Sequence, residues 1–282
     1  MRLARIVGPD GVPYLARLDG GVATPIAISG FRPGEDPLRD AMFDEVDLNA
    51  SPQVAPEFSV KGMRFLPPMA APSKIIAIGL NYADHARESG MEIPASPLLF
   101  MKAPSGLVGH DEPIRFRAAA TSRVDFEAEL AVVVGRRAYM VNEDEAFAHV
   151  FGYTVCNDVS ARDAQFADGQ WVRGKSFDTF CPLGPSIVTR EEIPDPHNLA
   201  IGARLNGRVM QDSNTREMVA GVPKLLSYIS QFMTLEPGDI IATGTPFGVG
   251  FSRTPPVYLT DGDVVEVEVE QVGILRNPVV VE

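Results

Sequence analysis

Residues 125–135 read Asp-Phe-Glu-Ala-Glu-Leu-Ala-Val-Val-Val-Gly, and this stretch indicates what kind of fold the chain adopts. The apolar, largely β-branched run after Glu129 favours a strand. On a strand, Glu127 and Glu129 point to the same face about 6 to 7 Å apart, close enough to bind one hard cation together. The alternative for two such glutamates is a solvated strand face.

Strand patterns recur on both sides of this stretch, at residues 74–79, 150–156, 187–188, 199–205, 239–242 and 264–270. The last of these alternates strictly between valine and an acidic residue, as a strand with one wet face does. The 25 glycines and 24 prolines divide the chain into short segments. We therefore expect an α+β fold in which strands dominate.

Helical spacing is found at residues 82–89, 143–148 and 223–233. The last segment begins with a proline in its first turn, which helices tolerate. Its apolar side chains recur at helical intervals and predict one buried face made of Leu225, Leu226, Ile229 and Phe232.

The chain is expected to divide near residue 70. Short strands are predicted at residues 3–7, 14–18 and 22–28, followed by a polar stretch around 34–47 and a linker at 51–57. A proline cluster then marks the boundary, at Pro67, Pro68 and Pro72. This predicts a small N-terminal β-rich domain over residues 1–70 and a larger domain over 71–282.

Composition excludes several classes of protein. Among 282 residues, 37 are acidic and 25 basic, giving a net charge of −12 and no visible basic cluster, so we expect no nucleic-acid partner. The longest charge-free run, 240–252, is shorter than the ~18 apolar residues of a membrane helix, and no signal-peptide core follows the N-terminus. Cys156 and Cys181 form no disulfide framework, which favours a reducing, cytoplasmic location.

A third carboxylate strengthens the prediction of a cation site. Asp158 follows the predicted strand at 150–156, where it could join Glu127 and Glu129 in a three-carboxylate site with open positions. Such oxygen ligands suit Mg²⁺ or Mn²⁺. The alternative for Asp158 is a helix N-cap.

A second candidate group lies in the predicted helix at 82–89. His85 and Glu88 are three residues apart on one face, so the carboxylate can orient the imidazole as a general base that activates water. The alternative is a surface ion pair. The remaining histidines, His110, His149 and His197, are interpreted as structural.

Residues 169–176, Gly-Gln-Trp-Val-Arg-Gly-Lys-Ser, match the P-loop pattern letter for letter. A P-loop requires a buried strand before it and a helix after it. Neither is predicted here, because Pro182 prevents the following segment from continuing as a helix. A nucleotide-binding protein is therefore the disfavoured alternative.

Five motifs, taken together and in this order, resemble the fumarylacetoacetate hydrolase family, over about residues 74–282. They lie at residues 79–85, 127–130, 157–165, 174–179 and 243–250. The resemblance implies a mixed β-roll catalytic domain, a homodimer, and Mg²⁺ or Mn²⁺ as cofactor. Residues 1–70 resemble the variable N-terminal region of small bacterial members.

The resemblance also implies roles for individual residues. The metal ligands would be Glu127, Glu129 and Asp158. The catalytic groups would be His85 and Glu88, on a helix that closes as a lid, and Lys175, which stabilises developing negative charge. The residues contacting the substrate would be Arg162, Gln165, Gly244 and Thr245. Larger animal hydrolases have a further acidic ligand just before the histidine, whereas residues 77–79 are apolar here, which implies the smaller three-carboxylate branch.

The expected reaction is hydrolysis of a C–C bond in a small anionic 2-oxo acid of the acylpyruvate or fumarylpyruvate type. The metal would polarise the substrate and stabilise the enolate, and His85 would activate water. The alternatives at the same site are oxaloacetate decarboxylation, dioate isomerisation and ureidoglycolate lyase activity. A non-catalytic β-rich module would be expected to lose some of these residues, yet all are present.

Overall fold

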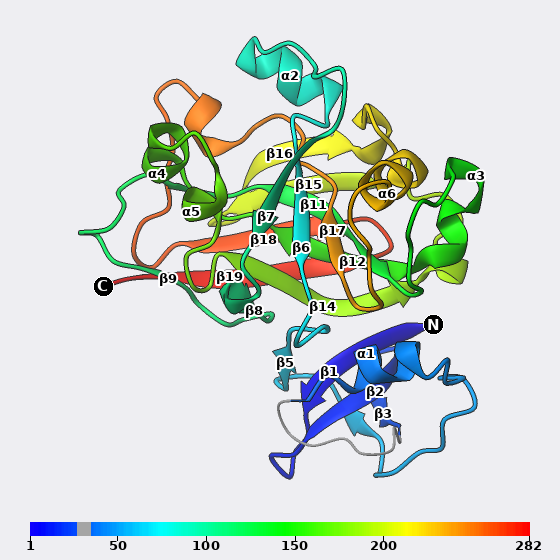
Figure 1. Cartoon of the computed structure of the whole chain (residues 1–282). Helices are drawn as coiled ribbons and strands as arrows, with labels where there is room; N and C mark the ends of the chain where they lie inside the picture. The colour runs from blue at the N-terminus through cyan, green and yellow to red at the C-terminus, as the bar shows by residue number, and fades with distance from the viewer. Residues whose placement is uncertain (27–34) are drawn as a thin grey trace.

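The computed structural model describes residues 1–26 and 35–282, and strands dominate it, as predicted (Figure 1). The largest sheet has 12 strands. Its main path runs β4 (Phe58–Ser59), β3 (Val22–Pro25), β2 (Pro13–Asp19), β1 (Arg2–Val7), β14 (Cys181–Thr189), β12 (Val150–Asn157), β11 (Ala128–Val134), β17 (Ile240–Ala242), β6 (Ile75–Gly79) and β7 (Leu98–Lys102). Off this path, β5 (Arg64–Leu66) pairs with β1, and β8 (Leu107–Val108) pairs with β14.

A second sheet of five strands packs against the first. Its order is β16 (Arg208–Asn214), β15 (Ala200–Leu205), β18 (Val264–Val269), β19 (Gly273–Val281) and β9 (Ile114–Phe116). A two-stranded ladder joins β10 (Val124–Asp125) to β13 (Ser160–Ala161).

Strand β11 is the centre of the molecule. Leu130 and Val132 belong to the core cluster that also holds the inward valines of β18. Ala131 and Val133 point the other way, into a cluster that includes Leu3 of the N-terminal region. Both faces of β11 are therefore buried, which explains why its sequence is an unbroken apolar run rather than an alternation.

Six α-helices are found among the described residues: α1 (Pro37–Phe43), α2 (Ala83–Ser89), α3 (Glu143–Ala146), α4 (Arg162–Ala167), α5 (Val172–Lys175) and α6 (Val222–Ser230). Short 3₁₀ turns accompany them at Pro104–Gly106, Phe147–His149, Arg190–Glu192, Thr215–Glu217 and Gly250–Ser252. Helix α2 lies above the upper ends of β6 and β7 in Figure 1. None of the described helices combines the length and apolar character needed to cross a membrane.

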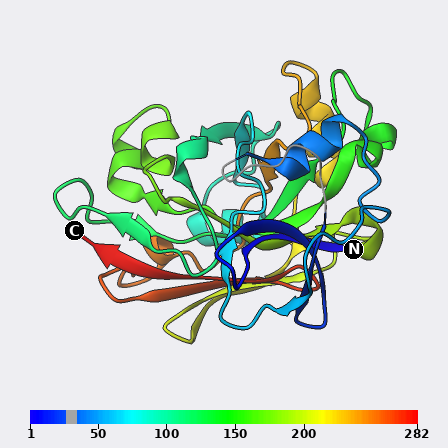
Figure 2. The ribbon, with the colours of Figure 1, turned by 90° about the horizontal axis from the view of Figure 1, so that it is seen from below.

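The N-terminal region continues the main sheet. In Figure 1 it lies below the rest of the chain, and in the view from below, Figure 2, it lies in front of it. The connection is the antiparallel pairing of β1 with β14, with Leu3 opposite Ile187. The division near residue 70 stays a prediction.

Three sequence expectations need correction. The polar stretch around 34–47 contains helix α1, whose first turn is capped by Asp36 accepting a hydrogen bond from the Arg39 N–H at 3.2 Å. The strand predicted at 22–28 ends at Pro25, and residues 27–28 lie outside the described residues. Helix α6 ends at Ser230, so Phe232 lies beyond it and is 54% exposed instead of completing the buried face.

Candidate active site

Three carboxylates meet where β11 and β12 lie side by side. Glu127 precedes β11, Glu129 is its second residue, and Asp158 follows β12. The pairing of these strands and a backbone hydrogen bond from the Asp158 N–H to the Glu127 carbonyl, at 3.0 Å, hold the three residues together. One oxygen from each side chain lies within 4.8 Å of the others, and all three residues are buried.

Buried cations lie against these carboxylates. The Lys175 ammonium donates to Glu127 Oε2 at 2.7 Å and to Asp158 Oδ2 at 2.6 Å. The Lys102 ammonium, at the end of β7, donates to Asp158 Oδ1 at 2.5 Å. Residues 169–176 follow helix α4 instead of a strand, and their lysine is held in the acidic cluster, so the geometry is not that of a P-loop.

The three carboxylates differ in their pKa values. Burial works to raise the pKa of Glu127, but the charges of Lys175 and Arg162 outweigh it and hold this pKa far below its ordinary range. Burial raises the pKa of Glu129 well above its ordinary value, and the negative charges of Asp158 and Glu127 add to the effect. A further positive charge beside Glu129 would favour its ionised form and lower this pKa.

This donor set fits a divalent ion. Its three potential ligands are all carboxylates, the oxygen chemistry that Mg²⁺ and Mn²⁺ prefer. Like charges crowded in a buried site repel one another, and for Glu129 burial and this repulsion outweigh the charge of Lys175 and the hydrogen bond from the Gly244 N–H. A cation bound by Glu127, Glu129 and Asp158 would compensate this repulsion.

Helix α2 carries the predicted dyad. His85 Nδ1 lies 3.4 Å from Glu88 Oε2, and the imidazole is buried. The backbone N–H of Gly248 donates to both oxygens of Glu88 at 3.0 Å, so the carboxylate is held from two sides. Because Glu88 lies at Nδ1, Nε2 is the ring nitrogen that this carboxylate does not contact.

Asn81 fixes the start of the segment that carries this helix. Its side-chain amide donates to the carbonyl oxygens of Ala220 and Thr243 at 3.0 and 2.8 Å. Its carbonyl oxygen accepts from the Ala220 N–H at 2.9 Å. One buried side chain therefore ties the approach to α2 to the end of β17 and to the segment before α6.

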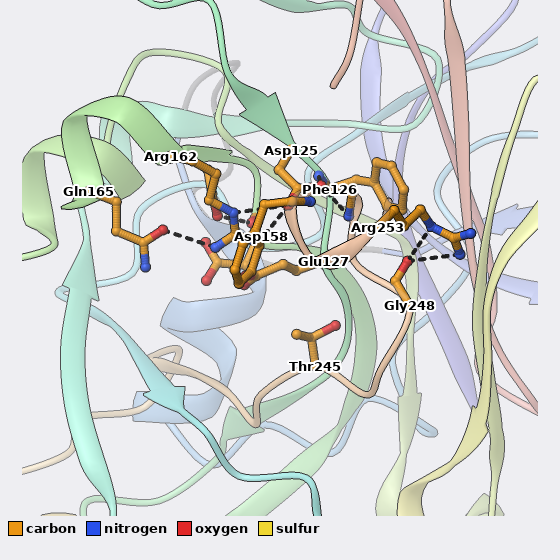
Figure 3. A network of polar contacts seen from close by, with 12 residues as sticks. Asp125, Phe126, Glu127, Asp158, Arg162, Gln165, Thr245, Gly248 and Arg253 are labelled. Atoms are coloured by element: carbon orange, nitrogen blue, oxygen red, sulfur yellow. Dashed lines mark hydrogen bonds and ion pairs between the residues drawn. The ribbon is translucent and has the colours of Figure 1, made fainter. Parts of the chain in front are cut away.

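The structure places Arg162 among protein partners. Its guanidinium lies 2.6 Å from Glu127 Oε1 and 2.8 Å from Asp125 Oδ2. It also donates to Gln165 Oε1 at 2.9 Å, and Figure 3 shows Arg162 between Asp125 and Gln165. The predicted substrate contacts of Arg162 and Gln165 remain predictions, and the observed role of Arg162 is to bridge carboxylates.

Gly244 and Thr245 follow β17 and face the same cluster. The Gly244 N–H donates to Glu129 Oε2 at 2.9 Å. The Thr245 hydroxyl accepts from the Gln211 side-chain amide at 2.8 Å, and the Gln211 carbonyl oxygen accepts from the Ala128 N–H at 2.9 Å. These bonds connect both residues to β11, whereas the substrate contacts expected of them stay predictions.

Sequence reasoning missed two residues of the site, Lys102 and Asp125. Lys102 is 1% exposed, and a lysine at the end of the apolar run Leu98–Lys102 is a signal that could have identified it, because a buried lysine requires a partner. Asp125 is fully buried beside Arg162, and nothing in its local sequence predicts that long-range contact.

Known proteins resemble this chain closely. The mitochondrial oxaloacetate tautomerase FAHD2A of Bos taurus is 50% identical over 218 residues, covering 77% of this chain and 69% of the bovine protein. A solved fumarylacetoacetate hydrolase from Exiguobacterium antarcticum is 37% identical with a TM-score of 0.86, covering 100% of both chains. A 2-hydroxyhepta-2,4-diene-1,7-dioate isomerase from Mycobacterium marinum is 38% identical with a TM-score of 0.80, covering 100% of this chain and 99% of its own.

One further comparison agrees with the order of the five motifs, the mixed sheets and the cluster of three carboxylates. The family model described as Fumarylacetoacetate (FAA) hydrolase C-terminal matches residues 74–280, most of the chain. The chain belongs to the fumarylacetoacetate hydrolase family.

Proposed function

We propose that this protein is a metal-dependent enzyme that interconverts the enol and keto forms of oxaloacetate or a closely related 2-oxo dicarboxylate. The observation that carries the proposal is the buried cluster of Glu127, Glu129 and Asp158 together with the His85–Glu88 dyad. The bovine relative, named an oxaloacetate tautomerase, supports this reaction better than the hydrolysis expected from the sequence, although tautomerisation was not among the alternatives that the sequence suggested.

The residues have distinct tasks in this proposal. A divalent ion held by the three carboxylates would act as a Lewis acid toward the carboxylate and keto oxygens of the substrate. In ketonisation, protonated His85 gives its Nε2 proton to carbon 3 of the substrate while the enol oxygen releases its proton to water. In the reverse direction, neutral His85 takes a proton from carbon 3 while water returns one to the oxygen. Glu88 orients the imidazole and stabilises its protonated form. Lys175 balances the charge of two ligands and adds to the positive potential that attracts a dianion.

The presence of the His85–Glu88 dyad no longer favours hydrolysis over the other reactions. A histidine-carboxylate dyad was expected to activate water, but a proton transfer at carbon requires a base in the same way. Hydrolysis of a C–C bond is the second candidate, supported by the likeness to the solved fumarylacetoacetate hydrolase. Homodimer assembly and a cytoplasmic location stay predictions.

The test is a comparison of substrates. Oxaloacetate in its enol form is mixed with the Mn²⁺-loaded enzyme, and the loss of enol absorbance is followed together with pyruvate release and acylpyruvate cleavage. We expect rapid enol loss without pyruvate release, abolished by EDTA and restored by Mn²⁺ or Mg²⁺. His85→Ala should slow it at least 100-fold. Faster acylpyruvate cleavage than enol loss would favour the hydrolase instead, and activity in rigorously metal-free protein would refute the metal's role.

A further inference from the structure

One loop connects the dyad to the acidic cluster. Residues 247–253, which we call the strap, lie after β17 and include the turn Gly250–Ser252. At one point the strap binds Glu88 through the Gly248 N–H, at 3.0 Å from both carboxylate oxygens. The Arg253 side chain donates back to the Gly248 carbonyl at 3.2 and 3.1 Å, as Figure 3 shows. The strap is thus closed on itself around the residue that holds Glu88.

Asp125 anchors the next part of the strap. Its Oδ1 accepts from the Gly250 N–H at 2.8 Å, and its Oδ2 accepts from the Phe251 N–H at 3.0 Å. The same Oδ2 accepts from Arg162 Nε at 2.9 Å. Asp125 is 0% exposed, so these bonds are formed away from water, where an unpaired charge is costly. One carboxylate therefore joins the strap to Arg162.

Arg162 extends the connection to a predicted metal ligand. Its guanidinium lies 2.6 Å from Glu127 Oε1 and stands 4.4 Å from the centre of the Phe251 ring. The Phe251 ring in turn meets the His85 imidazole edge to face, with centres 6.5 Å apart. The contacts run from His85 and Glu88 through the strap and Asp125 to Glu127.

The glycines of the strap permit this close approach. A Cβ atom on Gly250 would lie 2.5 Å from Asp125 Oδ1 and 2.0 Å from the Val257 carbonyl oxygen. Gly248 has φ = +95°, a conformation that other residues avoid, and a Cβ there would lie 2.3 Å from the Met210 carbonyl oxygen. Both glycines are therefore required for the strap to reach Asp125 and Glu88 together.

We propose that Asp125 is a positioning residue that couples the metal site to the helix carrying His85, by fixing Arg162 against Glu127 and the strap against Glu88. The inference rests on the metal site of the proposed function. Partners of this kind orient metal ligands, and their loss weakens metal affinity about 10- to 100-fold. Because coupling of two equilibria is reciprocal, metal binding should also stabilise the seating of α2 on the strap.

The first test measures metal affinity without substrate. Free Mn²⁺ is titrated by its electron paramagnetic resonance signal against the full-length wild type and Asp125→Asn. The control is Asp239→Asn. Asp239 is equally buried, and it accepts from the Lys74 and Glu236 N–H groups at 3.1 and 2.8 Å. It directly precedes β17, however, whereas the strap follows that strand. We expect about 10- to 100-fold weaker binding in Asp125→Asn and unchanged binding in Asp239→Asn. Equal affinity in all three, or equal loss in both variants, would overturn the proposal.

The second test measures the coupling. Hydrogen exchange of residues 83–89 and 247–251 should slow on adding Mn²⁺ to the wild type, and this protection should disappear in Asp125→Asn at saturating Mn²⁺. If Asp125 acts through Arg162, then Asp125→Asn combined with Arg162→Gln binds Mn²⁺ no more weakly than Arg162→Gln alone. Additive losses, or Mn²⁺ protection that survives in Asp125→Asn, would contradict the coupling. A wild type that binds no Mn²⁺ would instead refute the proposed function.

Discussion

Glu88 combines a role in the dyad with a contribution to stability that depends on pH. Burial works to raise its pKa, but the hydrogen bonds from His85 and Gly248 outweigh it, so the pKa lies below its ordinary value. A carboxylate whose pKa is lowered by folding stabilises the folded state above its unfolded-state pKa of about 4.3, and this contribution is lost as the pH falls through the folded-state pKa.

Glu88→Gln should therefore reduce the free energy of unfolding at neutral pH by about 1 kcal/mol. This is less than the roughly 1.5 to 3 kcal/mol of hydrogen bonds to a buried charged group, because solvent partly screens the exposed Glu88. Urea unfolding at a series of pH values from 7 down to about 3 should show the difference from the wild type shrinking as Glu88 is protonated. The control is Glu92→Gln, since Glu92 is exposed in the loop after α2. A difference that stays constant or grows toward acid pH would contradict this account.

Lys102 compensates the charge of Asp158, one of the three carboxylates proposed to bind the metal. Its ammonium donates to Asp158 Oδ1 at 2.5 Å and to the Lys175 carbonyl at 2.5 Å, and its side chain is fully buried. Removing one partner of a buried ion pair costs about 3 to 5 kcal/mol, because the other charge is left uncompensated. We expect Lys102→Met to lower the melting temperature of the metal-free protein strongly.

Mn²⁺ should restore part of that loss, because a cation bound at the carboxylates supplies the missing positive charge. The rise in melting temperature on adding Mn²⁺ should be larger in Lys102→Met than in the wild type. Lys74→Met is the matched control, since the Lys74 ammonium lies 2.5 Å from the buried Asp239, away from the three carboxylates. An equal Mn²⁺ effect in all three proteins would show that Lys102 does not act on this site.

At the scale of elements, helix α6 shows which parts of an amphipathic pattern are buried. Leu225, Leu226 and Ile229 are within 1% of full burial, whereas Phe232 is 54% exposed beyond the end of the helix. Leu226→Ala should lower the free energy of unfolding by about 2 to 5 kcal/mol, the range for creating such a cavity. Phe232→Ala should change it by about 0.5 kcal/mol or less, because exposed substitutions have small effects. Chemical denaturation of the two variants checks the contrast, and a large effect of Phe232→Ala would show that its ring is covered in solution.

The elements that could be predicted from the sequence are those whose pattern is local. The strands around 128–134 and 264–269 carry apolar runs or strict alternation, and the structure contains both as β11 and β18. Helix α1 was missed because it is short and acidic residues flank it, which made residues 34–47 read as a polar stretch. Leu38, Ala41 and Met42 are buried at helical spacing, a local signal that could have identified it. The contact of its capping Asp36 with the Ala70 N–H, at 2.6 Å, is one that local sequence does not indicate.

In the candidate site, too, the residues at local strand positions were predicted and the long-range contacts were not. Glu127, Glu129 and Asp158 were predicted because each lies at a recognisable strand position, and the structure brings them together. The contacts of Asp125 with Arg162 and with residues 250–251 join parts of the chain 37 and 125 to 126 positions apart. Such long-range pairing depends on how the two sheets pack, which no local pattern specifies.

At the scale of the whole molecule, the N-terminal region shares its core with the rest of the chain. The cluster that contains Leu3, Leu15 and Leu38 also contains Ile75 and Ile187. Strand β1 also pairs with β14 in an antiparallel ladder. A region joined by both a sheet and a core is expected to unfold together with its neighbour, because neither can keep its buried surface alone.

Trp171 makes this expectation measurable. It is the single tryptophan of the chain, and it lies in the larger region, 5.3 Å from the ring of Phe100. Ile6, by contrast, belongs to a small cluster confined to residues 6–65. Ile6→Ala should lower the stability of the N-terminal region by about 2 to 5 kcal/mol. If the chain unfolds as one unit, the free energy of unfolding measured from Trp171 fluorescence falls by the same amount. The fluorescence transition is then single and coincides with the one seen by circular dichroism. An unchanged Trp171 midpoint, with an earlier transition in circular dichroism alone, would show instead that residues 1–70 fold and unfold as a separate domain.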